Sequence, residues 1–74
     1  MSSVVVSVKE MNVKEKTVLA SLRSGKAERE VVLYCNRPGI DLERFKEGDI
    51  LKVYFWPEEV RDNRIKVMDM VPNT

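Results

Sequence analysis

The stretch that decides the fold is GDILKVYFWP, residues 48–57, the most apolar part of the 74-residue chain. Successive side chains of a β-strand point to opposite faces, so a strand with one face on a core alternates in character. Leu51, Val53 and Phe55 fall on one side of this segment and are predicted to point into a core. The other row is predicted to point outward: Ile50, Lys52, Tyr54 and Trp56. Pro57 has no N–H for a strand ladder and is expected to end the strand.

Four other segments predict strands, because β-branched and apolar residues recur in them between stretches that favour turns. These segments are residues 4–11, 17–23, 29–35 and 64–71. Their predicted inward residues are Val18, Ala20, Leu22, Val31, Leu33, Cys35, Ile65 and Val67. A charged loop over 58–63, ending in the turn-forming pair Asp62 and Asn63, is expected to join the last two strands.

One short helix is predicted within IDLERFKEG, residues 40–48. Asp41 can accept hydrogen bonds from the free N–H groups of the first turn, and Gly48 is expected to end the helix. A helix of under two turns is not stable alone in water, so it must pack against the rest of the fold. Three apolar residues are expected to plug it into the core: Ile40, Leu42 and Phe45. The preceding NRPG, residues 36–39, favours a type II turn with Gly39 at positive φ.

The resulting order is strand, strand, strand, short helix, strand, strand, and it resembles the oligonucleotide/oligosaccharide-binding (OB) fold. Residues 48–67, GDILKVYFWPEEVRDNRIKV, are similar to the final hairpin of the small bacterial translation initiation factor family. Residues 17–35, TVLASLRSGKAEREVVLYC, are similar to the central hairpin of single-strand-binding domains of the replication protein A type. We therefore expect an all-β protein: a five-stranded Greek-key OB-fold barrel with one short helix between strands 3 and 4, forming a single domain over residues 1–74. An SH3-like or Sm-like barrel is the competing fold, but the Sm-like order places its helix before the first strand.

The residue types present argue against an enzyme. The chain has no histidine and one cysteine, so it can form neither a zinc site of Cys and His ligands nor an internal disulfide. Cys35 ends an apolar segment and is expected to be a buried hydrophobic residue. Asp41, Glu47 and Asp49 gather at the ends of the predicted helix, where capping and turn formation already explain them. We expect no catalytic residue, no metal and no cofactor.

Composition and charge limit the kinds of partner that the protein is expected to bind. Apolar residues make up 43% of the chain and charged residues 34%, which is typical of a globular soluble protein. No apolar run is long enough for a spanning helix and no signal-peptide pattern is present, so a cytoplasmic protein without a membrane partner is expected. The net charge is +1, but residues 1–37 hold seven basic and four acidic side chains, so a modest basic face remains. The lack of glutamine and the short loops fit a heat-adapted, thermophile source.

Two outward faces combine cations with aromatic rings, the pairing that binders of single-stranded nucleic acid use for phosphates and bases. The first predicted patch lies on the last two strands: Lys52, Tyr54, Trp56, Arg64 and Lys66. The second lies across strands two and three, with Val32 and Tyr34 beside Leu19, Ser21 and Arg23, and with Lys26, Arg29 and Arg37 at its edges. Loop residues could close over a bound strand there: Lys14, Lys16 and Arg61. The resemblance favours the second patch, because ligands of the OB fold lie across strands two and three.

The sequence thus predicts a non-enzymatic module that binds single-stranded DNA or RNA by backbone electrostatics and aromatic stacking. The alternative is a structural or adaptor subunit, because outward Leu19, Val32 and Ile50 would also suit an interface in a homo-oligomer or a larger protein assembly. Two further interpretations stay open. The rings can pack against the barrel itself, and Lys and Arg mixed with Glu, as in KAERE, are typical of a solvated surface.

Overall fold

A computed structural model gives the fold; it describes residues 1–73, and for Arg23 and Ser24 the backbone alone. Five strands follow one another along the chain: β1 (Ser2–Asn12), β2 (Thr17–Ser24), β3 (Ala27–Tyr34), β4 (Ile50–Arg61) and β5 (Arg64–Pro72). A single 3-10 turn, η1 (Leu42–Arg44), lies between β3 and β4. The all-β prediction with one short helical element at this position is confirmed.

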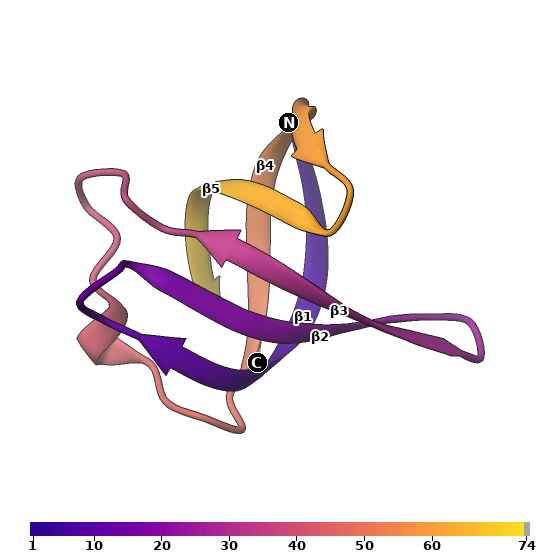
Figure 1. Cartoon of the computed structure of the whole chain (residues 1–74), viewed down its shortest axis with the longest axis horizontal. Coiled ribbons are helices and arrows are strands. Elements are labelled where there is room, and N and C mark those ends of the chain that lie inside the picture. The colour runs from indigo at the N-terminus through magenta and orange to yellow at the C-terminus, as the bar shows by residue number, and fades with distance from the viewer. Residues whose placement is uncertain (74) are drawn as a thin grey trace.

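The strands close into a barrel in the order β1-β2-β3-β5-β4, with β4 pairing back onto β1 (Figure 1). The β3–β5 pair is parallel and the other pairs are antiparallel. Register shifts interrupt β1 between Val8 and Glu10 and β4 near Phe55, and such irregularities let strands bend around a small barrel. This five-stranded closed barrel is compatible with an OB-like fold.

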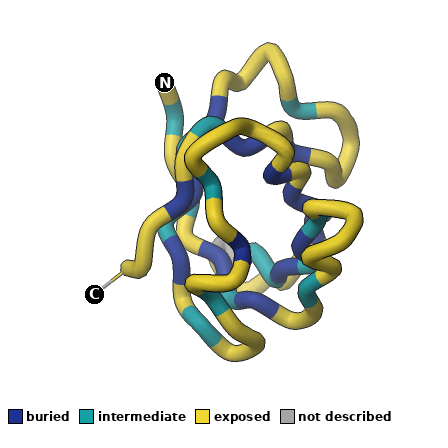
Figure 2. Tube along the Cα trace, turned by 90° about the vertical axis from the view of Figure 1, so that its left-hand side faces the viewer, coloured by how far each residue is buried: buried dark blue, intermediate teal, exposed yellow. Residues whose placement is uncertain are grey.

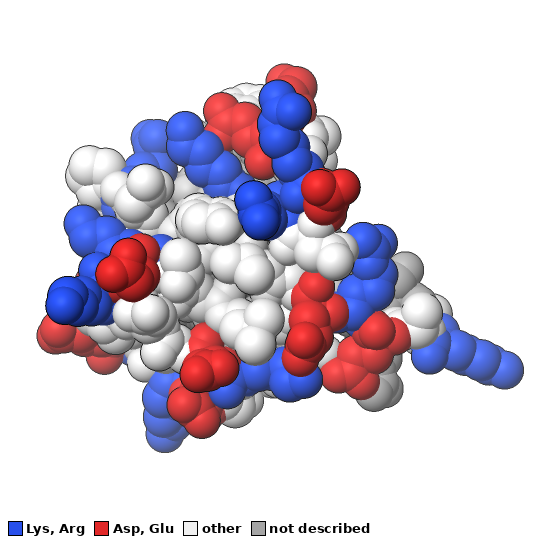
Figure 3. Space-filling view, viewed as in Figure 1, with Lys and Arg blue, Asp and Glu red and all other residues white. Residues whose placement is uncertain are grey.

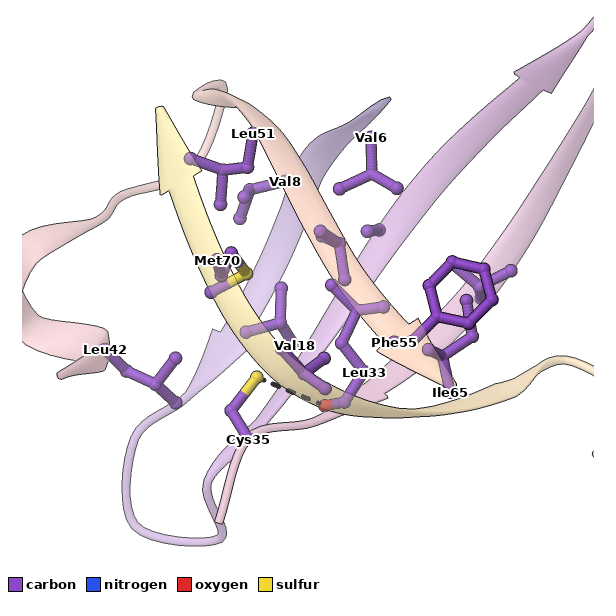
Figure 4. Close-up of a cluster of buried hydrophobic side chains, with 14 residues drawn as sticks. Val6, Val8, Val18, Leu33, Cys35, Leu42, Leu51, Phe55, Ile65 and Met70 are labelled. Carbon is purple, nitrogen blue, oxygen red and sulfur yellow. Dashed lines mark hydrogen bonds between the residues drawn. The ribbon is translucent and has the colours of Figure 1, made fainter. Parts of the chain in front are cut away.

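The core fills the barrel interior and consists of apolar side chains. Figure 2 shows buried positions alternating along the strands with more exposed ones, and Figure 4 shows the buried side chains converging between the strands. The predicted inward residues of β4, β5 and the β3 segment are buried, as are Val18 and Ala20 of β2; Leu22 is half-buried. The alternation of the sequence therefore correctly predicted which strand residues point into the barrel and which point outward.

In place of the helix predicted within residues 40–48, the structure has the three-residue 3-10 turn η1. The Asp41 carboxylate accepts a hydrogen bond from the Glu43 N–H at 3.0 Å, which is the predicted cap. The turn ends at Phe45 rather than at Gly48, whose N–H instead donates to the carbonyl of Val8 at 2.9 Å. Leu42 is buried, and Ile40 and Phe45 are partly buried against the core. Three residues of 3-10 helix are enough to carry the plug into the end of the barrel.

Strand β4 does not end at Pro57, which corrects the sequence prediction. The strand continues to Arg61, and most of the expected 58–63 loop is strand. Pairing with β5 is irregular between Phe55 and Val60 and then resumes, with Val60 opposite Ile65. Proline is tolerated in strands at such irregular positions because no ladder hydrogen bond is required of it there.

Candidate functional site

Strand pairing assembles two rows of side chains on the outer face of β1, β2, β3 and β5. The first row runs Glu10, Leu19, Val32, Arg64. The second runs Asn12, Thr17, Tyr34, Lys66. Directly opposed residues of neighbouring strands share a face, so Tyr34 lies beside Lys66 and Val32 beside Arg64. The parallel β3–β5 pair thereby joins a ring from one half of the chain to cations from the other.

Two open depressions of about 360 and 390 Å³ adjoin this face. Both are lined by Asn36, Glu59 and Lys66, so they form one continuous surface. We call it the basic groove; its lining residues are Tyr34, Asn36, Arg37, Pro38, Trp56, Glu59, Arg61, Arg64, Lys66, Val67 and Met68. It contains six of the residues predicted for nucleic-acid binding: Tyr34, Arg37, Trp56, Arg61, Arg64 and Lys66.

Rings and cations in the basic groove are open to solvent. Tyr34 is 37% exposed and Trp56 is 41% exposed. Four Lys and Arg side chains line the groove against a single carboxylate, Glu59, whose Oε2 lies 3.8 Å from the Lys66 Nζ. Figure 3 shows Lys and Arg side chains, with Asp and Glu among them, around an uncharged middle. The groove is therefore an accessible, locally positive surface.

Two tight turns hold cationic side chains at the ends of the groove. Arg37 opens the predicted turn, in which the Ile40 N–H donates to the Arg37 carbonyl at 3.3 Å and Gly39 takes a φ of 98°. The Arg37 guanidinium also lies 3.9 Å from the sulfur of Met68 on β5. Arg61 and Arg64 flank the turn between β4 and β5, where Asp62 takes a φ of 54°.

The first predicted patch is divided by the structure. Trp56, Arg64 and Lys66 lie in the basic groove, but Lys52 and Tyr54 do not line it. Lys52 is paired with Val5 of β1 and Val71 of β5, and its ammonium lies 5.5 Å from the centre of the Tyr54 ring. The β4–β5 register shifts between Tyr54 and Phe55, that is, between these two groups of residues.

The second predicted patch is also divided. Arg29 lies on the inward row of β3, two residues before buried Val31, and its guanidinium donates to the Asn63 side chain at 2.7 Å. Lys26 is exposed at the tip of the β2–β3 hairpin, which projects beyond the barrel (Figure 1). The Arg23 side chain lies outside the described residues. Lys14 and Lys16 are exposed in the turn between β1 and β2, whose Lys16 carbonyl accepts the Cys35 N–H at 2.8 Å.

Carboxylates occupy the part of the β2–β3 face toward the hairpin tip. The Lys9 ammonium donates to Glu30 at 2.6 Å, and this hydrogen bond raises the pKa of Lys9. The Ser21 hydroxyl donates to the carboxylate of Glu28. The cations of the basic groove belong instead to the loop after β3, to β4 and to β5.

Sequence reasoning missed two polar residues of the groove. Asn36 was noted only as part of a turn, and Glu59 was placed in a loop because Pro57 was expected to end the strand. The position of Glu59 beside Lys66 could not be predicted from the local sequence, because it depends on the irregular pairing of β4 with β5.

Among residues 1–73 no group of three or more His, Cys, Asp or Glu side chains is arranged to hold a metal ion. In the part of the chain that the structure describes, no helix has both the length and the apolar character needed to cross a membrane. No protein-family model matches the chain, and neither the curated proteins nor the solved structures provide a match.

Proposed function

We propose that this protein binds single-stranded nucleic acid in the basic groove. The observation that carries the proposal is the meeting of two exposed rings, Tyr34 and Trp56, with four cations in one open groove. Cations attract the phosphates of a strand, and exposed rings stack on its bases, each stacked base contributing about 1–3 kcal/mol. An unpaired strand suits this surface better than a duplex does, because its bases are free to reach the rings.

The positions of the groove residues support a strand that runs along β5. Tyr34 and Trp56 line different depressions, and Lys66 lines both. A backbone that passes Lys66 would place successive bases toward each ring, while Arg37, Arg61 and Arg64 supply further phosphate contacts. The net charge of the whole chain is only +1, so attraction depends on this local gathering of charge.

The proposal is tested by titrating a short oligothymidine into the protein at low salt and following the fluorescence of Trp56, the only tryptophan. Tyr34→Ala should weaken binding by about 1–3 kcal/mol, because it removes one stacking ring. Tyr54→Ala is the matched control: it removes the same type of side chain outside the groove and should leave the affinity unchanged. Absence of quenching in the unaltered protein, or equal losses in both variants, would contradict the proposal.

The second candidate function is self-association through the outer face of β1, β4 and β5. Three large apolar side chains are exposed there, Val5 at 44%, Ile50 at 46% and Val71 at 38%. Val5 and Val71 are both paired with Lys52 on β4. Neither Lys52 nor Asp69 has an ion-pair partner among the described residues. In a dimer with a two-fold axis, Lys52 of one copy could therefore pair with Asp69 of the other copy.

Sedimentation at increasing protein concentration tests this second candidate. Ile50→Lys should abolish a dimer that uses this face, because it buries an unpaired charge. Val13→Lys is the control, since Val13 is equally exposed at 46% but lies in the turn between β1 and β2. A protein that stays monomeric at every concentration would exclude self-association.

A further inference from the structure

We infer that the basic groove prefers guanine at the junction of its two depressions, with Glu59 as the residue that determines this specificity. The inference rests on the proposed function, since it concerns the base identity of a strand bound in the same groove. Stacking and phosphate contacts are tolerant of sequence, so any preference must come from a group that reads base edges.

The position of Glu59 makes it such a group. Tyr34 lines one depression, Trp56 lines the other, and Asn36, Glu59 and Lys66 line both. A base stacked on either ring would therefore lie in a depression that Glu59 and Asn36 also line. Both are polar side chains in a groove otherwise made of cations, rings, Pro38, Val67 and Met68.

The Glu59 carboxylate is available to a ligand. Its Oε2 lies 3.8 Å from the Lys66 Nζ, which is beyond hydrogen-bond distance, and the Glu59 side chain is 40% exposed. No other described group donates a hydrogen bond to it, and the Asn36 side-chain amide likewise has no partner within residues 1–73. The junction therefore offers a carboxylate whose two oxygens accept no hydrogen bond from the described residues, beside an amide that can both donate and accept.

Guanine is the base whose edge matches this arrangement. An ionised carboxylate only accepts, and it can accept two parallel hydrogen bonds. Guanine presents its N1–H and 2-amino donors side by side, and its O6 acceptor next to them can take a hydrogen bond from the Asn36 amide. Adenine and cytosine each place an acceptor nitrogen beside their amino group, and thymine or uracil flanks one N–H with two carbonyls. These bases would bring a lone pair toward the carboxylate and be disfavoured.

The test compares oligothymidines of one length that differ in a single central nucleotide: thymidine, deoxyguanosine, deoxyadenosine or deoxyinosine. Affinity is taken from Trp56 fluorescence and, independently, from the anisotropy of a labelled strand. Deoxyguanosine should bind at least about fivefold more tightly than thymidine, the lower end of what a bidentate base contact contributes. Deoxyinosine lacks the 2-amino group, so it should lose most of this advantage.

Glu59→Gln should bind the thymidine strand more tightly than the unaltered protein does, because a negative charge leaves the groove, and should lose the preference for guanine. Glu58→Gln is the matched control: it makes the same charge change at an exposed neighbour that does not line the groove, and should retain the preference. Urea unfolding of both variants verifies that they fold.

A guanine preference that survives in Glu59→Gln, or equal binding of all four strands by the unaltered protein, would overturn the inference and leave the proposed function standing. Absence of binding to every strand would overturn the proposed function and this inference with it. The thymidine strand separates the two failures, because its binding needs only rings and cations.

Discussion

Cys35 is a free cysteine in the barrel interior, and its environment suppresses the reactivity of its thiol. It is buried, and its thiol lies 3.8 Å from the Leu33 carbonyl, a weak sulfur hydrogen bond (Figure 4). Burial penalises the thiolate and raises the pKa of Cys35 to about 12 from an ordinary value of 9.0. A thiol held neutral in this way is a poor nucleophile, so the residue acts as a small apolar side chain.

The raised pKa of Cys35 predicts a loss of stability in alkali. The folded-state pKa lies above the unfolded one, so the stability that the neutral thiol provides is complete below pH 9 and falls as the pH approaches 12. Between pH 8 and pH 10 the free energy of unfolding should fall by about 1.4 kcal/mol more in the unaltered protein than in Cys35→Ala. Urea unfolding at both pH values measures this. Equal losses in the two proteins would show that Cys35 is not the cause.

A second prediction at this scale concerns Asp62, which takes a φ of 54° in the turn between β4 and β5. Aspartate tolerates this left-handed conformation, glycine adopts it freely, and β-branched residues do not. Asp62→Gly should leave the free energy of unfolding equal or raise it by up to about 1 kcal/mol, whereas Asp62→Val should lower it by about 1–2 kcal/mol. Thermal unfolding of both variants measures the change. A valine variant as stable as the unaltered protein would mean that the turn adopts another conformation.

At the scale of the elements, local patterns predicted most of the barrel and non-local pairing accounts for the rest. The inward row of Leu51, Val53 and Phe55 could be predicted because burial of one face imposes a period of two on the sequence itself. The continuation of β4 past Pro57 could not, because it depends on partners in β5 that lie beyond a turn. The same limit applies to the groove. Tyr34 and Trp56 were predicted as binding residues from the local pattern, whereas Glu59 was not, because its place in the groove depends on non-local pairing.

The η1 turn is short, yet its burial predicts a large effect on stability. Leu42 is 4% exposed and lies at the end of the core away from Phe55 and Ile65 (Figure 4). Leu42→Ala should lower the free energy of unfolding by about 2–5 kcal/mol, because it leaves a cavity where the barrel end is closed. Glu43→Ala, an exposed change in the same turn, should stay within about 0.5 kcal/mol. Urea unfolding compares them, and a small loss for Leu42→Ala would show that the turn does not act as a plug.

At the scale of the whole molecule, the closed barrel separates surfaces that the linear sequence places together. The basic groove gathers side chains from β3, the loop after β3, β4 and β5. Lys52 and Tyr54, although close to Trp56 in sequence, belong to the face that carries Val5 and Val71. Composition alone shows a chain near neutrality, whereas folding concentrates four cations around one carboxylate. Closure of the barrel thus separates a surface rich in cations from one that exposes Val5, Ile50 and Val71.

This separation predicts how binding depends on salt. If all four cations of the groove displace counterions from a single strand, the logarithm of the association constant should fall with the logarithm of salt concentration with a slope of about −2.8. Arg64→Ala removes one groove cation and should make that slope shallower by about 0.7. Lys52→Ala removes the same charge from the other face and should leave the slope unchanged, because a contact that is not made releases no counterion. Titrations of oligothymidine at several salt concentrations measure all three slopes. Equal changes in the two variants would mean that the strand responds to the net charge of the protein rather than to the groove.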